Sequence, residues 1–91
     1  MNSIGQNWFF TYVLRCENKE TLYTGTTNDL NRRIKEHNLG LVFYTKNKLP
    51  VRLIYFEACL NKDDAYRRER YLKTGMGKRY LKNRLRGGLT G

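Results

Sequence analysis

The sequence is poor in acidic side chains. Eight Asp and Glu residues stand against eighteen Lys and Arg residues, which gives a formal charge of +10 at neutral pH. Ten of the basic residues, but only three of the acidic ones, lie between Lys62 and Arg86. A surplus of this size and clustering favours a polyanionic partner, usually a nucleic acid. The alternative is a basic helical surface that merely keeps a small domain in solution.

Long apolar runs are also absent. No segment reaches membrane-spanning length and the N-terminus carries no signal-peptide pattern, so we expect a soluble, cytoplasmic protein without a membrane partner. Cys16 and Cys59 lie far apart without a CxxC spacing, which argues against a zinc site. Both lie in apolar, strand-like segments, and this context predicts reduced thiols that fill the core.

The length of 91 residues allows one domain with a modest core. Hydrophobic residues make up 40% of the chain, which is ordinary for a folded protein, and we find neither a repeat nor a linker. Residues 1–7 are polar and without periodicity, and residues 87–91 are rich in glycine. We therefore predict a disordered N-terminus over 1–7, a single domain over 8–86 and a flexible tail over 87–91.

The first half of the domain predicts a β-hairpin. Trp8–Cys16 is aromatic and β-branched, which suits a strand. A short polar loop follows, and Thr21–Thr24 predicts a second strand that stops at Gly25.

The register of this hairpin decides which side chains meet. If Cys16 lies opposite Thr21, Leu14 lies opposite Tyr23, and Tyr12 then shares a sheet face with Tyr23. A slip of one residue would place the two tyrosines on opposite faces, so the inference depends on the register.

The remainder of the chain predicts a third strand and three helices. Thr26 or Thr27 would cap a helix that ends near residues 38–40, and a basic loop leads to Pro50 and a strand over 51–58. Asn61 would cap a helix to about Lys73, and Gly75 and Gly77 would break it before a last helix over 78–86. The expected fold is α+β: a small three-stranded antiparallel sheet flanked by helices, in the order β-β-α-β-α-α.

Three polar side chains lie on helix faces that should be apolar. Arg33 and His37 follow Leu30 by three and seven residues, which places them on the inward face of the first helix. Glu69 lies between apolar positions of the second helix. Inward-facing groups of this kind are costly unless they pair with each other or take part in chemistry. A buried Arg33–Glu69 ion pair and a His37 that only caps its helix are the structural alternatives.

Several motifs occur in a recognisable order. They are Phe10-Thr11-Tyr12, Tyr23-Thr24-Gly25, the helix pattern over 27–38, Tyr44-Thr45-Lys46, Leu49-Pro50-Val51, the run over 65–69 and Tyr71-Leu72-Lys73-Thr74-Gly75. Over residues 8–86 the chain resembles the GIY-YIG nuclease family, in its small single-domain bacterial branch, which is similar to the N-terminal domain of excision-repair nucleases. It departs from the family where Phe10 and Thr11 replace Gly and Ile, and where Thr24 replaces Ile.

The resemblance implies a role for each inward-facing group. Glu69 corresponds to the carboxylate that binds Mg²⁺, for which Mn²⁺ is a possible substitute. Arg33 would hold phosphate oxygens and neutralise charge in the transition state. Gly25 would permit a close backbone approach where the strand turns into the helix.

The resemblance also implies that Tyr12 helps to activate the attacking water. A free tyrosine is a poor base near neutral pH, so the metal, Arg33 and His37 would have to stabilise its anion. His37 would hydrogen-bond a tyrosine or relay a proton, and Tyr23 would position water or phosphate. Either tyrosine alone could equally be a core residue with one polar end.

The main hypothesis is a metal-dependent DNA endonuclease, selective for DNA structure in repair or recombination, and monomeric. Seven basic residues are expected to contact phosphates: Lys46, Arg67, Arg68, Arg70, Lys73, Lys78 and Arg79. The alternatives are a non-catalytic nucleic-acid-binding module on the same fold, or a nuclease subunit that needs a protein partner for recognition, since the chain has no room for a second domain.

Overall fold

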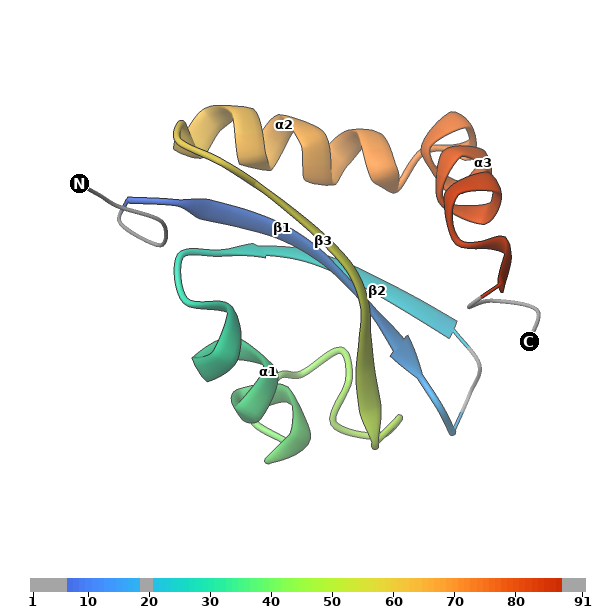
Figure 1. Cartoon of the computed structure of the whole chain (residues 1–91). Coiled ribbons are helices and arrows are strands. Elements are labelled where there is room, and N and C mark those ends of the chain that lie inside the picture. The colour runs from blue at the N-terminus through green and yellow to red at the C-terminus, as the bar shows by residue number, and fades with distance from the viewer. Residues whose placement is uncertain (1–6, 19–20, 88–91) are drawn as a thin grey trace.

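A computed structural model describes residues 7–18 and 21–87 (Figure 1). The described elements follow the order β-β-α-β-α-α, so the expected α+β fold is confirmed. Their bounds are β1 Phe9–Cys16, β2 Thr21–Thr27, α1 Leu30–Asn38, β3 Val51–Cys59, α2 Lys62–Leu72 and α3 Gly75–Arg84. The N-terminus and tail that the sequence predicts to be unstructured fall largely on residues 1–6 and 88–91, which lie outside the described residues.

The sheet is antiparallel and has the strand order β2-β1-β3. Cys16 pairs with Thr21, and Leu14 pairs with Tyr23, as the hairpin predicts. The prediction that the second strand stops at Gly25 is wrong, because β2 continues to Thr27. Gly25 lies within the β1–β2 ladder, opposite Tyr12. The Tyr12 ring fills the space that a side chain on Gly25 would occupy.

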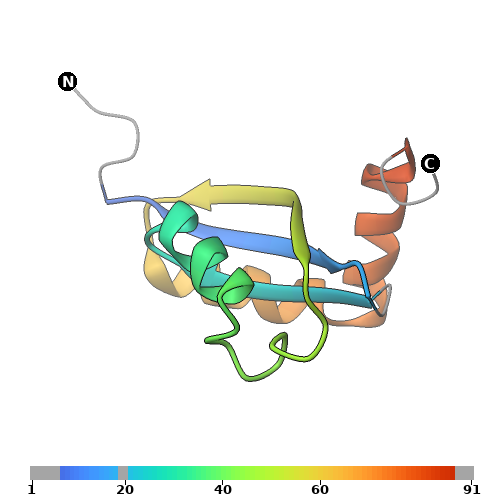
Figure 2. The ribbon, with the colours of Figure 1, turned by 90° about the horizontal axis from the view of Figure 1, so that it is seen from below.

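The two faces of the sheet are covered by different helices. Figures 1 and 2 show α2 and α3 on one side of the sheet, and α1 with the loop that follows it on the other. Alternating residues of β1 supply both cores, since successive side chains of a strand point to opposite faces. Tyr12, Leu14 and Cys16 pack against Leu30 and Ile34 of α1. On the other face, Val13 packs with Leu72 of α2 and Leu81 of α3.

Helix α1 begins later than the sequence predicts. Its N-cap is Asp29, whose carboxylate accepts a hydrogen bond from the backbone N–H of Arg32 at 3.1 Å. The expected caps Thr26 and Thr27 belong to β2 instead. A carboxylate satisfies an orphan N–H of the first turn at least as well as a hydroxyl, so the longer strand leaves the helix no weaker. Gly40 follows the helix with φ +78°, a left-handed conformation that glycine adopts readily, within the range where the sequence predicts the helix to end.

The junction of α2 and α3 also differs from the prediction. Asn61 caps α2 as expected. Helix α3, however, begins at Gly75 with Thr74 as N-cap and runs through Gly77, so the predicted break at these glycines is wrong. Gly77 is buried, and a side chain there would collide with the backbone of Tyr71. The glycine therefore permits α3 to pack tightly on the end of α2.

The two cysteines are both free thiols but differ in burial. Cys16 is buried in the core, as predicted. Cys59 is partly exposed at the end of β3, where its thiol donates to the carbonyl of Asn61, so the prediction that it fills the core is wrong. Among the described residues, no helix has the length and apolar character needed to cross a membrane.

Candidate active site

Two tyrosines and a histidine form a cluster between the sheet and α1. Tyr12 and Tyr23 come from neighbouring strands and share a sheet face, with their ring centroids 6.3 Å apart. The ring of His37, from the last turn of α1, lies 5.9 Å from Tyr12 and 5.0 Å from Tyr23 in edge-on contacts. The predicted register and the inward position of His37 are thus both confirmed.

A chain of hydrogen bonds runs through this cluster. The Tyr12 hydroxyl and His37 Nε2 are 3.0 Å apart, and His37 Nδ1 lies 2.7 Å from the Thr45 hydroxyl. All three residues are at most 1% exposed. Both ring nitrogens therefore have partners, and His37 does more than cap a helix. The sequence assigned no role to Thr45, and the only signal there was its place in the Tyr44-Thr45-Lys46 motif.

The buried pair is neutral at pH 7. Burial, helped by the positive charge of Arg33, lowers the pKa of His37 to about 4. Burial also raises the pKa of Tyr12 to about 12, although its interaction with Arg33 opposes this rise. A phenol and an uncharged imidazole are the expected forms in the free protein.

Gly25 supplies the space for the Tyr12 ring. The two residues are direct partners in the β1–β2 ladder, and a methyl group on Gly25 would lie 2.6 Å from the Tyr12 hydroxyl oxygen. The close approach at Gly25 is thus made by the tyrosine itself. It occurs within β2 and not at the turn into α1, where the sequence analysis placed it.

Arg33 lies between the cluster and the surface. Its guanidinium donates to the carboxylate of Glu36 at 3.0 Å, and about a third of the side chain (34%) is exposed. The nearby Tyr12 hydroxyl raises the pKa of Arg33, and Glu36 has the same effect. Arg33 also lines a hollow of about 300 Å³ together with Thr26. The structure shows an Arg33–Glu36 pair, a partner that the sequence analysis did not predict.

Glu69 approaches from the opposite sheet face. It comes from α2, where one carboxylate oxygen accepts from the Thr26 hydroxyl at 2.6 Å and the other binds the Lys73 ammonium at 2.8 Å. Its side chain is 18% exposed. The negative charge of Glu69 raises the pKa of Tyr12, so the two groups are electrostatically coupled across the edge strand. The candidate site therefore wraps around β2, with four of its groups on one face and Glu69 on the other.

A known protein family matches most of the chain. The family described as the GIY-YIG catalytic domain matches residues 8–85. The chain belongs to this family. Membership of the GIY-YIG family points to nuclease chemistry on a nucleic acid, typically with a divalent metal ion.

Similar proteins share the fold and most of the chain. A UPF0213 protein of Clostridium perfringens is 49% identical over 65 residues, which cover 70% of this chain and 69% of that protein. A UPF0213 protein of Pediococcus acidilactici is 39% identical over 89 residues, covering 91% and 90%. The solution NMR structure of a UPF0213 protein from Bacillus halodurans has a TM-score of 0.54 and 36% identity, and the match covers 89% of this chain and 87% of that one.

The GIY-YIG chain offers a metal ion one carboxylate. In the described parts of the chain no three His, Cys, Asp or Glu side chains come together to hold a metal. Glu69 is a hard oxygen ligand, and Mg²⁺ commonly binds one or two carboxylates and takes its other ligands from water and phosphate. Glu69 therefore fits such an ion, but the Lys73 ammonium already lies on one of its oxygens.

The basic residues differ in how they are engaged. Arg68 binds Glu57 at 2.9 Å and lies over the rings of Tyr71 and Tyr80. Arg67 pairs with an aspartate of its own helix, and the Lys46 ammonium lies over an exposed phenylalanine ring. The other residues expected to contact phosphates, besides Lys73, are exposed: Arg70, Lys78 and Arg79.

Proposed function

We propose that this chain is a metal-dependent DNA endonuclease that hydrolyses a phosphodiester bond by in-line attack of water. One observation carries the proposal: the Tyr12 hydroxyl lies against His37 and Arg33 at the sheet edge where the Glu69 carboxylate is partly exposed. A phenol, a guanidinium, an imidazole and a carboxylate in one place are the groups such a reaction uses.

Arg33 is suited to hold the scissile phosphate. Its guanidinium is one-third exposed and borders a hollow, so it can reach a phosphate while Glu36 fixes its orientation. A planar guanidinium binds two phosphate oxygens at once, and the charge that develops on them in the transition state strengthens both hydrogen bonds. Tyr23, half-buried beside His37, would position the water or the phosphate.

Tyr12 is suited to accept a proton from the attacking water. The buried Thr45 hydroxyl has His37 Nδ1 as the acceptor that the described residues show, so it donates to that nitrogen. The imidazole then carries its proton on Nε2 and donates it to the Tyr12 oxygen. Arg33 interacts with the same oxygen. The His37 donor and the positive charge of Arg33 both favour the phenolate. Tyr12 acts as a base only after its own phenol proton has left to bulk water, and the phenolate then accepts the proton of the attacking water.

A Mg²⁺ ion held by Glu69 would polarise the scissile phosphate and add the positive charge that the phenolate needs. The chain's own residues hold the phosphate, through Arg33, and the proton, through Tyr12. The GIY-YIG domain, residues 8–85, is small and has little surface of its own to read a long sequence. We therefore propose selection by DNA structure, as in repair or recombination.

The test is cleavage of labelled duplex, single-stranded, flap and four-way-junction DNA with Mg²⁺, with Mn²⁺ and with EDTA. Glu69→Gln and Tyr12→Phe should each lower the metal-dependent rate by about 100-fold or more. DNA binding in EDTA, measured on the same variants, should stay within a few-fold of the wild-type value. Cleavage that survives both substitutions would overturn the assignment of the site.

Two observations favour a second candidate, a non-catalytic nucleic-acid-binding module. Lys73 lies where a metal would bind Glu69, and Tyr12 is only 1% exposed. This candidate predicts binding without cutting on every DNA form, with Glu69→Gln leaving that binding unchanged or tighter. A subunit that needs a partner protein would also bind without cutting, but adding the partner would restore metal-dependent cleavage.

A further inference from the structure

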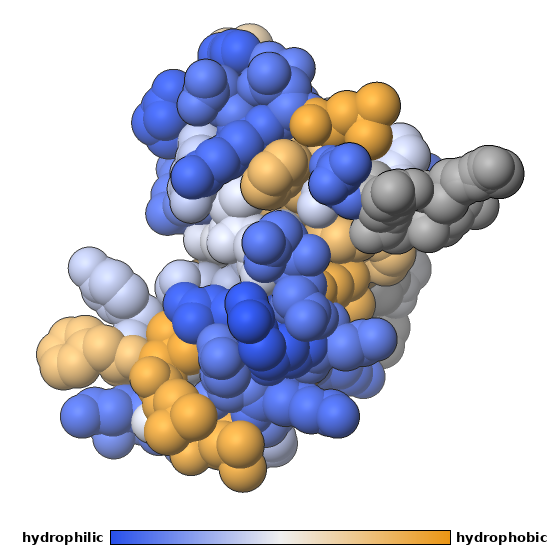
Figure 3. Space-filling view, turned by 90° about the vertical axis from the view of Figure 1, so that its left-hand side faces the viewer, coloured by the Kyte–Doolittle hydropathy of each residue, from blue (hydrophilic) through white to orange (hydrophobic). Residues whose placement is uncertain are grey.

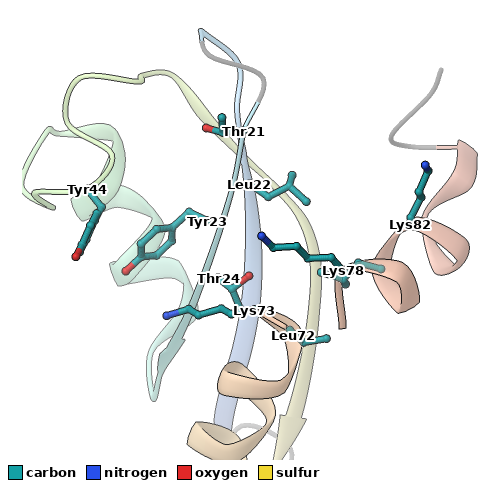
Figure 4. Close-up of a pocket in the computed structure, with 10 residues that line it drawn as sticks. Thr21, Leu22, Tyr23, Thr24, Tyr44, Leu72, Lys73, Lys78 and Lys82 are labelled. Atoms are coloured by element: carbon teal, nitrogen blue, oxygen red, sulfur yellow. The ribbon is translucent and has the colours of Figure 1, made fainter. Parts of the chain in front are cut away.

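A groove of about 870 Å³ lies beside the candidate site, between the edge strand β2 and helix α3 (Figure 4). Its apolar lining includes Leu22 of β2, Leu72 of α2 and Leu81 of α3. Leu72 and Leu81 belong to the core, whereas Leu22 is 42% exposed. A groove with a partly exposed apolar lining can bury the apolar face of a ligand.

Three lysines line the same groove. Lys73, Lys78 and Lys82 come from the end of α2 and from α3, and all three are exposed. Figure 4 shows the Lys78 side chain reaching from α3 toward the strand, the Lys82 side chain beside α3, and the Lys73 side chain extending away from α3 past Thr24. No carboxylate is among the described residues that line the groove. The lining is therefore positively charged and suits a polyanion, a ligand that carries several negative charges along its length.

The groove adjoins the candidate site. Tyr23 belongs to both, and Lys73 lines the groove while it binds the Glu69 carboxylate. The molecular surface is hollowed between α2 and α1 on the side where β1 begins (Figure 3). A polymer held at Arg33 and Glu69 would thus have a path along β2.

Two tyrosine rings line the groove on the other side of β2 from α3. Tyr44, from the loop after α1, is 71% exposed, and its ring centroid is 6.4 Å from that of Tyr23. Figure 4 shows both rings on the side of β2 away from α3, with the strand between them and Lys78. Exposed aromatic rings next to a row of cations are the combination on which unpaired bases stack while lysines bind the backbone.

We propose that this groove binds an unpaired polynucleotide segment that continues from the phosphate at the candidate site. The inference rests on the proposed nuclease function. Paired bases in a duplex keep their apolar faces within the stack, so a duplex gains little from an apolar lining with exposed tyrosine rings. An unpaired strand presents those faces together with its phosphates. The groove therefore selects DNA that has a single-stranded arm or gap beside the cleavage point.

The test measures binding in EDTA, on the Glu69→Gln background, so that cleavage does not enter. The probes are a fluorescent single-stranded 12-mer and the 12-base-pair duplex of the same sequence. Lys78→Gln with Lys82→Gln should weaken binding of the single strand by about tenfold and lower its salt slope by about 1.4, since each phosphate contact on a single strand contributes about 0.7. Duplex binding should change by less than about twofold.

Lys35→Gln is the matched control, because Lys35 is an exposed lysine of α1 that does not line the groove. It should leave the preference for the single strand unchanged. Tyr44→Ala should weaken single-strand binding by about tenfold and Tyr44→Phe should not, because the stacking surface remains. Thermal melts of every variant check that the fold is retained.

The possible outcomes distinguish failure of the groove proposal from failure of the nuclease proposal. Equal losses on both probes, or losses as large for Lys35→Gln, would overturn the groove and leave the nuclease proposal intact. The predicted pattern in a protein that cuts no DNA form would support the groove and contradict the nuclease. A single strand bound no better than the duplex by the parent protein would also overturn the groove.

Discussion

Tyr12 and Gly25 face each other across strands β1 and β2, and the Tyr12 ring occupies the space that a side chain on Gly25 would fill. This relationship places the Tyr12 hydroxyl at the edge of the sheet, against His37. Gly25, from the Tyr23-Thr24-Gly25 motif, therefore positions Tyr12, from the Phe10-Thr11-Tyr12 motif, through packing within the ladder.

Gly25→Ala should displace Tyr12 or strain the sheet. A methyl group 2.6 Å from the hydroxyl oxygen is a severe overlap, and overpacking of this kind costs about 1–3 kcal/mol of stability. Urea unfolding measures the loss. Gly75→Ala is the control, because a methyl group there meets no atom within 4 Å, and its stability should stay within about 0.5 kcal/mol of the parent. Equal effects of the two substitutions would contradict the packing role of Gly25.

The stability should fall as the pH falls from about 6.5 to about 4. The pKa of His37 is about 4 in the folded protein and near 6.5 when unfolded, so in this window the unfolded chain binds a proton that the folded chain does not. Above pH 6.5 both states are neutral and the effect vanishes. The full loss is about 3 kcal/mol.

The measurement compares urea unfolding of the parent and of His37→Gln between pH 7.5 and pH 4. The difference between the two curves isolates His37, because the carboxylates titrate alike in both proteins. Parallel curves would show that His37 titrates normally in the folded state.

Thr45→Val should allow the imidazole of His37 to populate both neutral tautomers. The substitution removes the hydroxyl that donates to Nδ1 and leaves that buried nitrogen unsatisfied, which costs about 1–3 kcal/mol. The ¹⁵N shifts of the imidazole should show the Nε2–H tautomer in the parent and in Thr45→Ser, and a mixture of tautomers in Thr45→Val. An Nδ1–H tautomer in the parent would contradict the proposed orientation of the hydrogen-bond chain.

Lys73→Gln should tighten metal binding to the DNA-free protein. The Lys73 ammonium lies 2.8 Å from Glu69 and competes with any cation there. Because Lys73 is half exposed, removing its charge is worth about 1 kcal/mol, or roughly fivefold in affinity. Titration of Mn²⁺ followed by electron paramagnetic resonance measures this, with Glu69→Gln as the variant that should not bind. Weaker binding by Lys73→Gln would contradict the competition.

The hairpin could be derived from local patterns, and its register followed on the condition that Cys16 lies opposite Thr21. A strand places successive side chains on opposite faces, and the four-residue loop between Cys16 and Thr21 leaves one register that keeps Tyr12 and Tyr23 together. Asn61 correctly predicted the start of α2, because a side-chain cap is a local interaction. The continuation of β2 past Gly25 could not be predicted in this way, since it depends on pairing with the partner strand β1.

The sequence by itself determined the order of the elements and the inward faces of the helices, because these depend on periodicity and on spacing along the chain. Its ordered motifs carried the resemblance to the family. Only the tertiary structure decided that Thr45 binds His37 and that Thr26 binds Glu69. The pairs Arg33–Glu36 and Glu69–Lys73, by contrast, are spaced by three and four residues, so the helical pattern already contained them. The tertiary structure also placed Glu69 across the edge strand from the tyrosines. Hydrogen bonds between segments far apart in sequence form where packing brings the segments together, and no local pattern encodes that distance.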